Sequence, residues 1–306
     1  MILSRLSLSA FLALATLSAC SGSSASTTID PNASDEKLFQ EGLALYNQMM
    51  FGPAAAKFDQ LLSTYPSSPR HDNAGYLTGR CAYELVDYPT AITKLVAMRT
   101  AHPDSLYLHS AAYFTGRSRF ELATYATATP DFRAAVAADP AGTFADNAQY
   151  YVGRSLYEAG DLTGARPELA AVETDYATSS YVDNARYYLG RTFFDAGDFT
   201  GALAPLERVF MTTGSSYADD AQFFIGRAHY GMGGVSLDTA LTDFETLVST
   251  YAGSQYLDNA VGYEARIYAD KVDCVTARQK FTELQTSYPG SVEIAPTDAY
   301  LIGKGC

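Results

Sequence analysis

The stretch DNAQYYVGR at residues 146–154 recurs as DNARYYLGR at residues 183–191, 37 positions further along the chain. The Gly-Arg pair that ends this stretch recurs at intervals of 36 or 37 residues, at Gly79-Arg80, Gly116-Arg117, Gly153-Arg154, Gly190-Arg191 and Gly226-Arg227. Gly42 lies 37 residues before this series, and Ala265-Arg266 and Gly303-Lys304 continue it. A fixed period of this length is typical of proteins that repeat one supersecondary unit. The sequence therefore predicts seven repeats and a closing half-repeat.

A second set of columns follows each Gly-Arg pair. An alanine comes about twelve residues after the glycine, a large apolar residue follows four positions later, and a further apolar or small residue three beyond that, as at Ala165, Leu169 and Val172. Residues at i, i+4 and i+7 share one face of an α-helix. Each unit is therefore predicted to be two antiparallel helices. Helix A carries the Gly-Arg pair, and helix B carries the alanine.

Local signals predict where some of these helices begin and end. Gly160-Asp161 and Gly197-Asp198 are expected to form the turn between helices A and B, because glycine ends a helix readily and Asp favours the start of the next. Pro130 predicts a late start for helix B of the third repeat, and Pro205 predicts a distortion within helix B of the fifth.

Together these columns resemble the tetratricopeptide repeat, which has a small residue at the eighth position of helix A and Ala, Phe or Leu, and Pro at similar offsets. The resemblance covers about residues 36–304 and implies an all-α fold, a right-handed α-solenoid of about seven helical hairpins with a C-terminal capping helix. The linkers Tyr65-Pro66-Ser67-Ser68 and Tyr288-Pro289-Gly290-Ser291 are similar to those of two bacterial envelope families. These are the periplasmic protein associated with the Tol–Pal system and the lipoprotein subunit of the outer-membrane β-barrel assembly machinery.

The N-terminal segment predicts where in the cell the protein is located. Residues 1–19 combine a basic residue, a short apolar run and small residues before Cys20, which is the pattern of a secretory signal peptide. Leu17-Ser18-Ala19-Cys20 resembles a bacterial lipobox, which implies that Cys20 is lipidated; the alternative is an ordinary signal peptide cut nearby. Ser21, rather than Asp, follows the cysteine, which by the same resemblance favours the outer membrane and a periplasm-facing protein. Residues 20–34 are then a polar tether, and residues 35–306 form the solenoid.

The resemblance also implies a binding groove along the stacked A helices, with positions five and nine of helix A facing it. Position five is a tyrosine in several repeats and position nine is an arginine, so the two columns form a ladder of rings and guanidinium groups along the groove. We hypothesise that this ladder holds an extended peptide or a C-terminal carboxylate of another envelope protein, because Arg offers a planar fork to carboxylates. Stacking of wall glycan on the tyrosines is a second possibility. The alternative is a purely structural ladder, in which each Arg stacks on its own repeat's Tyr and pairs with a neighbouring Asp. The candidate ladder residues are Tyr76, Arg80, Tyr113, Arg117, Tyr150, Arg154, Tyr187, Arg191 and Arg227.

Three further cysteines remain after Cys20. Cys274 and Cys306 could form a disulfide in an oxidising envelope, which would hold the last helix in place. Cys81 occupies a column of small residues, so we expect it to be buried and unreactive.

Composition and motifs argue against other function classes. The formal net charge of −13 disfavours binding to nucleic acid or to an anionic membrane surface. We find no metalloprotease, serine-hydrolase, phosphate-loop or Cys-X-X-Cys motif, and His71, His102, His109 and His229 are scattered along the chain without ligand spacing. The sequence therefore predicts a scaffold with no cofactor, no metal and no catalytic residues. A glycan-binding envelope module is the alternative function.

Overall fold

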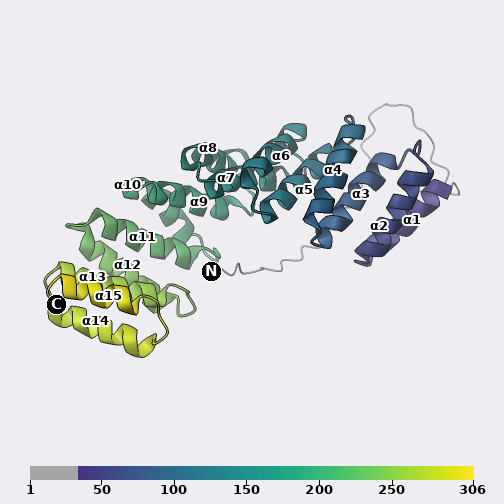
Figure 1. Ribbon diagram of the computed structural model, residues 1–306. Coiled ribbons are helices and arrows are strands. Elements are labelled where there is room, and N and C mark those ends of the chain that lie inside the picture. The colour runs from purple at the N-terminus through teal and green to yellow at the C-terminus, as the bar shows by residue number, and fades with distance from the viewer. Residues whose placement is uncertain (1–33) are drawn as a thin grey trace.

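The computed structural model describes residues 34–306, and these form fifteen α-helices and no strand (Figure 1). The signal peptide, Cys20 and nearly all of the tether lie outside the described residues, so their assignments stay predictions. Helix α1 begins at Ser34, the last residue that the sequence assigned to the tether. None of the described helices is long and apolar enough to cross a membrane.

The helices follow one another in chain order along an elongated, curved array (Figure 1). Their bounds are α1 (Ser34–Asn47), α2 (Phe51–Thr64), α3 (His71–Glu84), α4 (Tyr88–Ala101), α5 (Leu108–Glu121), α6 (Tyr125–Ala138), α7 (Ala145–Glu158), α8 (Leu162–Asp175), α9 (Val182–Asp195), α10 (Phe199–Phe210), α11 (Ala218–Met232), α12 (Ser236–Thr250), α13 (Leu257–Asp270), α14 (Cys274–Ser287) and α15 (Ile294–Gly303).

Odd-numbered helices up to α13 are the predicted A helices, and even-numbered helices are the B helices. Each helix packs against the next, which gives seven hairpins, and α15 packs on α13 and α14 as the predicted capping helix. This confirms the predicted all-α solenoid. Several A helices also contact the A helix of the next repeat; for example, α3 contacts α5 and α7 contacts α9. No B helix of residues 34–306 makes a comparable contact with the B helix of the next repeat. The A helices therefore line the inner side of the curve, and the B helices form the outer face.

The glycine of helix A and the alanine and large apolar residue of helix B meet at the centre of each hairpin. Ala165 and Leu169 of α8 are buried, and Leu169 lies directly against Gly153 of α7. A Cβ atom added at Gly153 would stand 2.5 Å from Leu169 Cγ. The glycine column is therefore explained by the close approach of helix A to helix B, and the periodic pattern follows from this one crossing.

Among residues 34–306, six of the seven turns between helices A and B are built in one of two ways, and the turn between α11 and α12 instead contains Gly233 and Gly234, both with positive φ angles. Gly160 and Gly197 adopt positive φ angles of 84° and 78°, and the Asp that follows each of them accepts a hydrogen bond from the backbone N–H three residues on, as predicted. Four other turns place a residue with a side chain in the same left-handed region, which is unfavourable for residues other than glycine. These residues are Met49, Val86, Ala123 and Val272.

The late start predicted from Pro130 is wrong, whereas the distortion predicted at Pro205 stays a prediction. Helix α6 begins at Tyr125 in the same register as the other B helices and contains Pro130, and α10 runs through Pro205 without interruption. Each proline removes one backbone donor from the helix. The helices nevertheless continue, because Phe132 and Leu206 anchor them in the core as fully buried side chains.

Candidate functional site

The position-nine arginines, counted so that the glycine is position eight, stack on the following repeat. The guanidinium carbon of Arg80 lies 3.6 Å from the ring centroid of Phe114, that of Arg117 lies 4.4 Å from Tyr151, and that of Arg154 lies 3.6 Å from Tyr188. Arg191 lies 4.0 Å from the ring of Phe224 in the same way. A cation over a ring face is electrostatically favourable, so each arginine joins two successive repeats.

Each of these four arginines also pairs with an acid one turn further along its own helix. Arg80 pairs with Glu84 at 2.5 Å, Arg117 with Glu121 at 2.9 Å, and Arg154 with Glu158 at 2.5 Å; Arg191 pairs with Asp195 at 3.2 Å. Only 19–21% of these arginine side chains is exposed. The structural alternative drawn from the sequence had each arginine stack on a ring of its own repeat and pair with an acid of a neighbouring repeat. The structure shows the opposite arrangement, because the ring comes from the next repeat and the acid from the same helix.

The position-five tyrosines do not present open rings to a groove. Tyr113, Tyr150 and Tyr187 are only 3–4% exposed, so the expectation that their faces line an open surface is wrong; Tyr76 is half-buried. Their hydroxyl groups accept hydrogen bonds from the arginine of the same helix, at 3.2 Å from Arg117, 3.5 Å from Arg154 and 3.1 Å from Arg191.

The residues that cover these tyrosines were missed by the sequence reasoning. An aromatic side chain just before each next A helix packs against the position-five ring. The ring centroids of Phe144 and Tyr113 lie 4.7 Å apart in a stacked pair, and those of Tyr181 and Tyr150 lie 5.1 Å apart in a tilted pair. The sequence did carry the signal, as an aromatic residue nine positions before the Gly-Arg column. The members of this column are Tyr107, Phe144, Tyr181, Tyr217 and Tyr256.

The electrostatics of the ladder follow from burial. Burial raises the pKa of Tyr181 to about 12 and raises the pKa values of Tyr150 and Tyr187 well above the usual range of a phenol. These hydroxyl groups therefore stay neutral at physiological pH. The guanidinium charges of Arg80, Arg117, Arg154 and Arg191 are balanced by the acids of their own helices, so this part of the ladder is close to neutral.

Arg227 departs from this pattern. Its guanidinium carbon lies 4.8 Å from the ring centroid of Phe194 and 5.4 Å from that of Phe224, so it stacks like the others. The residue one turn further on is Gly231, where the preceding four repeats have Glu or Asp. Within residues 34–306 the structure shows no carboxylate and no hydrogen-bond acceptor paired with Arg227. It is therefore the ladder member whose charge has no partner on its own helix.

The histidines and cysteines are placed as follows. His71 and His102 lie together at the base of one hairpin, with Nδ1 and Nε2 2.9 Å apart, which the sequence did not anticipate. The described residues contain no group of three side chains suited to hold a metal ion. A disulfide joins Cys274 to Cys306, with Cα atoms 4.9 Å apart. Cys81 is fully buried, and burial raises the pKa of its thiol to about 12, so the thiolate that would react is scarce.

These features define a helical-repeat protein whose inner face is built from periodic aromatic, arginine and acidic columns. The sequence matches the tetratricopeptide repeat family over residues 39–105, 113–180 and 153–218, and the chain belongs to that family. Proteins of this family are generally non-catalytic and bind other proteins.

Solved structures agree with this fold. The C-terminal part of a tetratricopeptide-repeat protein from Cytophaga hutchinsonii is 18% identical with a TM-score of 0.67, over 85% of this chain and 98% of that one. A tetratricopeptide repeat protein from Parabacteroides merdae is 11% identical with a TM-score of 0.55, over 88% and 98% of the two chains. The protein MamA is 18% identical with a TM-score of 0.52, over 60% and 92%. At these identities the likeness shows the fold alone. No curated protein sequence matches the chain.

Proposed function

We propose that this protein is a non-catalytic scaffold of the bacterial cell envelope, which is anchored by a lipid on Cys20 and docks other envelope proteins on the inner face of its solenoid. The signal-peptide pattern and the lipobox-like Leu17-Ser18-Ala19-Cys20 support the anchor, the outer membrane and the periplasm-facing orientation. The linker resemblance supports a role in outer-membrane protein assembly or in Tol–Pal-linked coordination of division.

Arg227 is the observation that carries the docking proposal. Its guanidinium is held among the rings of α9, α11 and α13, the nearest being that of Phe194, and no described acid neutralises it. A guanidinium offers a planar pair of donors that fits a carboxylate, and aromatic walls lower the local dielectric and strengthen such a contact. The ligand class that fits is a peptide that places a carboxylate at Arg227.

The docking proposal is tested by capture of periplasmic proteins on the purified solenoid, with isolated peptidoglycan as the competing ligand. Arg227→Gln should reduce capture of its protein partner at least tenfold. It should lower the melting temperature less than the loss of Arg117, Arg154 or Arg191 does, because it removes ring stacking but no ion pair. Arg133→Gln is the matched control, since Arg133 lies on the outer face and is 55% exposed. Capture that survives Arg227→Gln, or capture of peptidoglycan alone, would refute docking of proteins at this site.

The earlier ladder residues need a separate test. Replacing Arg117, Arg154 and Arg191 by Ala should lower the melting temperature, because each of them connects two repeats. Partner binding that persists in this variant, measured well below its melting temperature, would show that these three arginines are structural.

The anchor is tested by Cys20→Ala. The variant should move from the membrane fraction to the soluble fraction and lose metabolic labelling with palmitate. Retention of either property would exclude Cys20 as the lipid site.

A further inference from the structure

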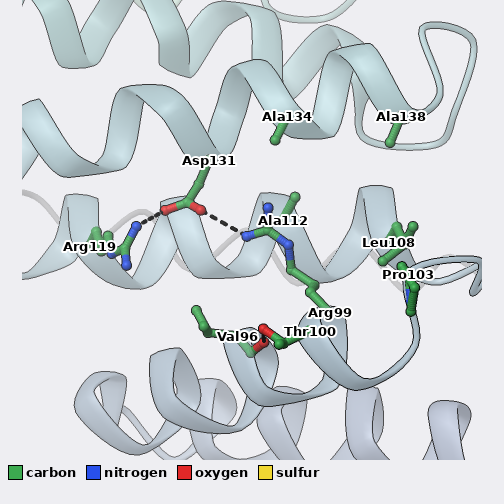
Figure 2. A pocket seen from close by; sticks show the side chains of 10 residues that line it. All are labelled: Val96, Arg99, Thr100, Pro103, Leu108, Ala112, Arg119, Asp131, Ala134 and Ala138. Atoms are coloured by element: carbon green, nitrogen blue, oxygen red, sulfur yellow. Dashed lines mark hydrogen bonds and ion pairs between the residues drawn. The ribbon is translucent and has the colours of Figure 1, made fainter.

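The outer face carries a groove of about 510 Å³ between helices α4 and α6, floored by α5 (Figure 2). Its walls are mainly apolar or small, and three charged side chains meet at one end. The lining residues are Val96, Arg99, Thr100, Pro103, Leu108, Ala112, Arg119, Asp131, Ala134 and Ala138. None of them belongs to the Tyr/Arg ladder of the inner face.

The groove is open because of one small residue on its floor. Ala112 lies four positions before Gly116, and the equivalent residues of the next three repeats are Gln149, Arg186 and Gln222. Gln149 of α7 donates a hydrogen bond to the backbone carbonyl of Glu168 on α8, the B helix of the same hairpin. Gln222 of α11 makes the same hydrogen bond to Asp243 of α12. These long side chains fill the space that Ala112 leaves empty.

The charged end of the groove has more positive than negative charge. Arg99 of α4 and Arg119 of α5 both donate to Asp131 of α6, with Arg99 Nη1 2.8 Å from Asp131 Oδ1. Asp131 is 7% exposed, whereas about a quarter of each arginine side chain is exposed. Among residues 34–306 the structure pairs the Nη2 atoms of the two arginines with no acceptor. One carboxylate therefore faces two guanidinium groups that retain free donors, on a protein of net charge −13.

We infer that this outer groove binds an acidic side chain within a peptide segment of a partner protein, with an apolar neighbour of that side chain against Leu108 and Ala134. The carboxylate accepts hydrogen bonds from the free Nη2 donors of Arg99 and Arg119 and thereby completes the charge balance around Asp131. Figure 2 shows the two arginines reaching Asp131 from opposite sides, with Leu108, Ala134 and Ala138 further along the groove. The site is separate from the inner-face docking proposed above and does not depend on it.

The test uses the whole solenoid labelled with ¹³C at its alanine methyl groups, because Ala112, Ala134 and Ala138 report directly from the groove. The probe is the peptide acetyl-Ala-Leu-Glu-Ala-amide, and its control is the same peptide with Gln in place of Glu. We expect the Glu peptide to shift these three methyl signals and to bind at least about tenfold more tightly than the Gln peptide, because hydrogen bonds to a charged carboxylate are stronger than those to a neutral amide.

Ala112→Gln is the matched variant, because repeats four and six carry Gln at this position and an Asp or Glu where Asp131 stands. It should fold with an unchanged helix content, fill the groove and abolish the shifts. Equal binding of the Glu and Gln peptides, no binding of either, or shifts that persist in Ala112→Gln would overturn the inference. Identical shifts from free glutarate at the same concentration would mean a small-anion pocket and would also overturn it.

Discussion

The glycine column allows one substitution to have opposite effects at two equivalent positions. At Gly153 an added Cβ atom would lie 2.5 Å from Leu169 Cγ, 2.7 Å from Leu169 Cδ2 and 3.0 Å from the Leu169 backbone N. Forcing such a contact costs about 1–3 kcal/mol by overpacking. The higher helix propensity of alanine returns about 1 kcal/mol. Because three atoms of Leu169 lie this close and one of them is backbone, the overpacking cost should fall in the upper part of that range, at about 2–3 kcal/mol. Gly153→Ala should therefore destabilise the solenoid by a net ~1–2 kcal/mol.

Gly303 is the control, because it closes the same Gly-Arg series but no helix B packs on it, and no atom lies within 4 Å of its added Cβ. Gly303→Ala should be neutral or stabilise by up to about 1 kcal/mol. The assay is the midpoint of urea unfolding followed by far-UV circular dichroism at 222 nm, since a repeat array does not guarantee a two-state extrapolation. A Gly153→Ala variant as stable as the parent, or a Gly303→Ala variant that loses as much as Gly153→Ala, would refute the close-approach explanation.

Three further outcomes can be measured. Arg154→Ala should cost about 2 kcal/mol of unfolding free energy, because it leaves Glu158 without its cation and uncovers the ring of Tyr188, whereas Arg133→Ala on the outer face should cost under about 0.5 kcal/mol; equal losses in chemical denaturation would contradict the ladder. Burial, together with the neighbouring His102, holds the pKa of His71 below its usual 6.5, so the unfolded chain binds more protons near this pH and stability should fall as the pH drops from 7 towards 5. His71→Leu, which introduces the residue that the next repeat carries at the equivalent position, Leu108, should reduce this pH dependence of the melting temperature, and an unchanged dependence would exclude His71 as its source. Reduction of the Cys274–Cys306 disulfide should add about 2 Da to the mass and lower stability by roughly 3–4 kcal/mol on the entropy account; two alkylatable thiols in the native protein besides Cys81 would exclude the bond.

The periodic columns were sufficient to predict the number of hairpins, which helix follows which and the core residues of each B helix. They were sufficient because helix A crosses helix B in the same way in every repeat. The small residue that Gly153 represents and the large residue that Leu169 represents are therefore required again at each repeat, which produces the period. The Gly160 and Gly197 turns were readable for a similar reason, since a left-handed conformation favours glycine. Val86 and Val272 adopt the same conformation without that signal, and only the structure identifies them.

The surroundings of the ladder required the tertiary structure. The sequence placed Tyr150 and Arg154 on one helix face, but whether that face is open depends on Tyr181 and Tyr188, which the next repeat supplies. Prediction from Pro130 failed because a local backbone preference is weaker than the burial of Phe132 and its neighbours. The outer groove was likewise invisible in the repeat pattern, since it arises where the small residue Ala112 coincides with Arg99, Arg119 and Asp131 from three helices. A periodic sequence determines the contacts that every repeat shares, and the packing of successive repeats decides which side chains remain accessible.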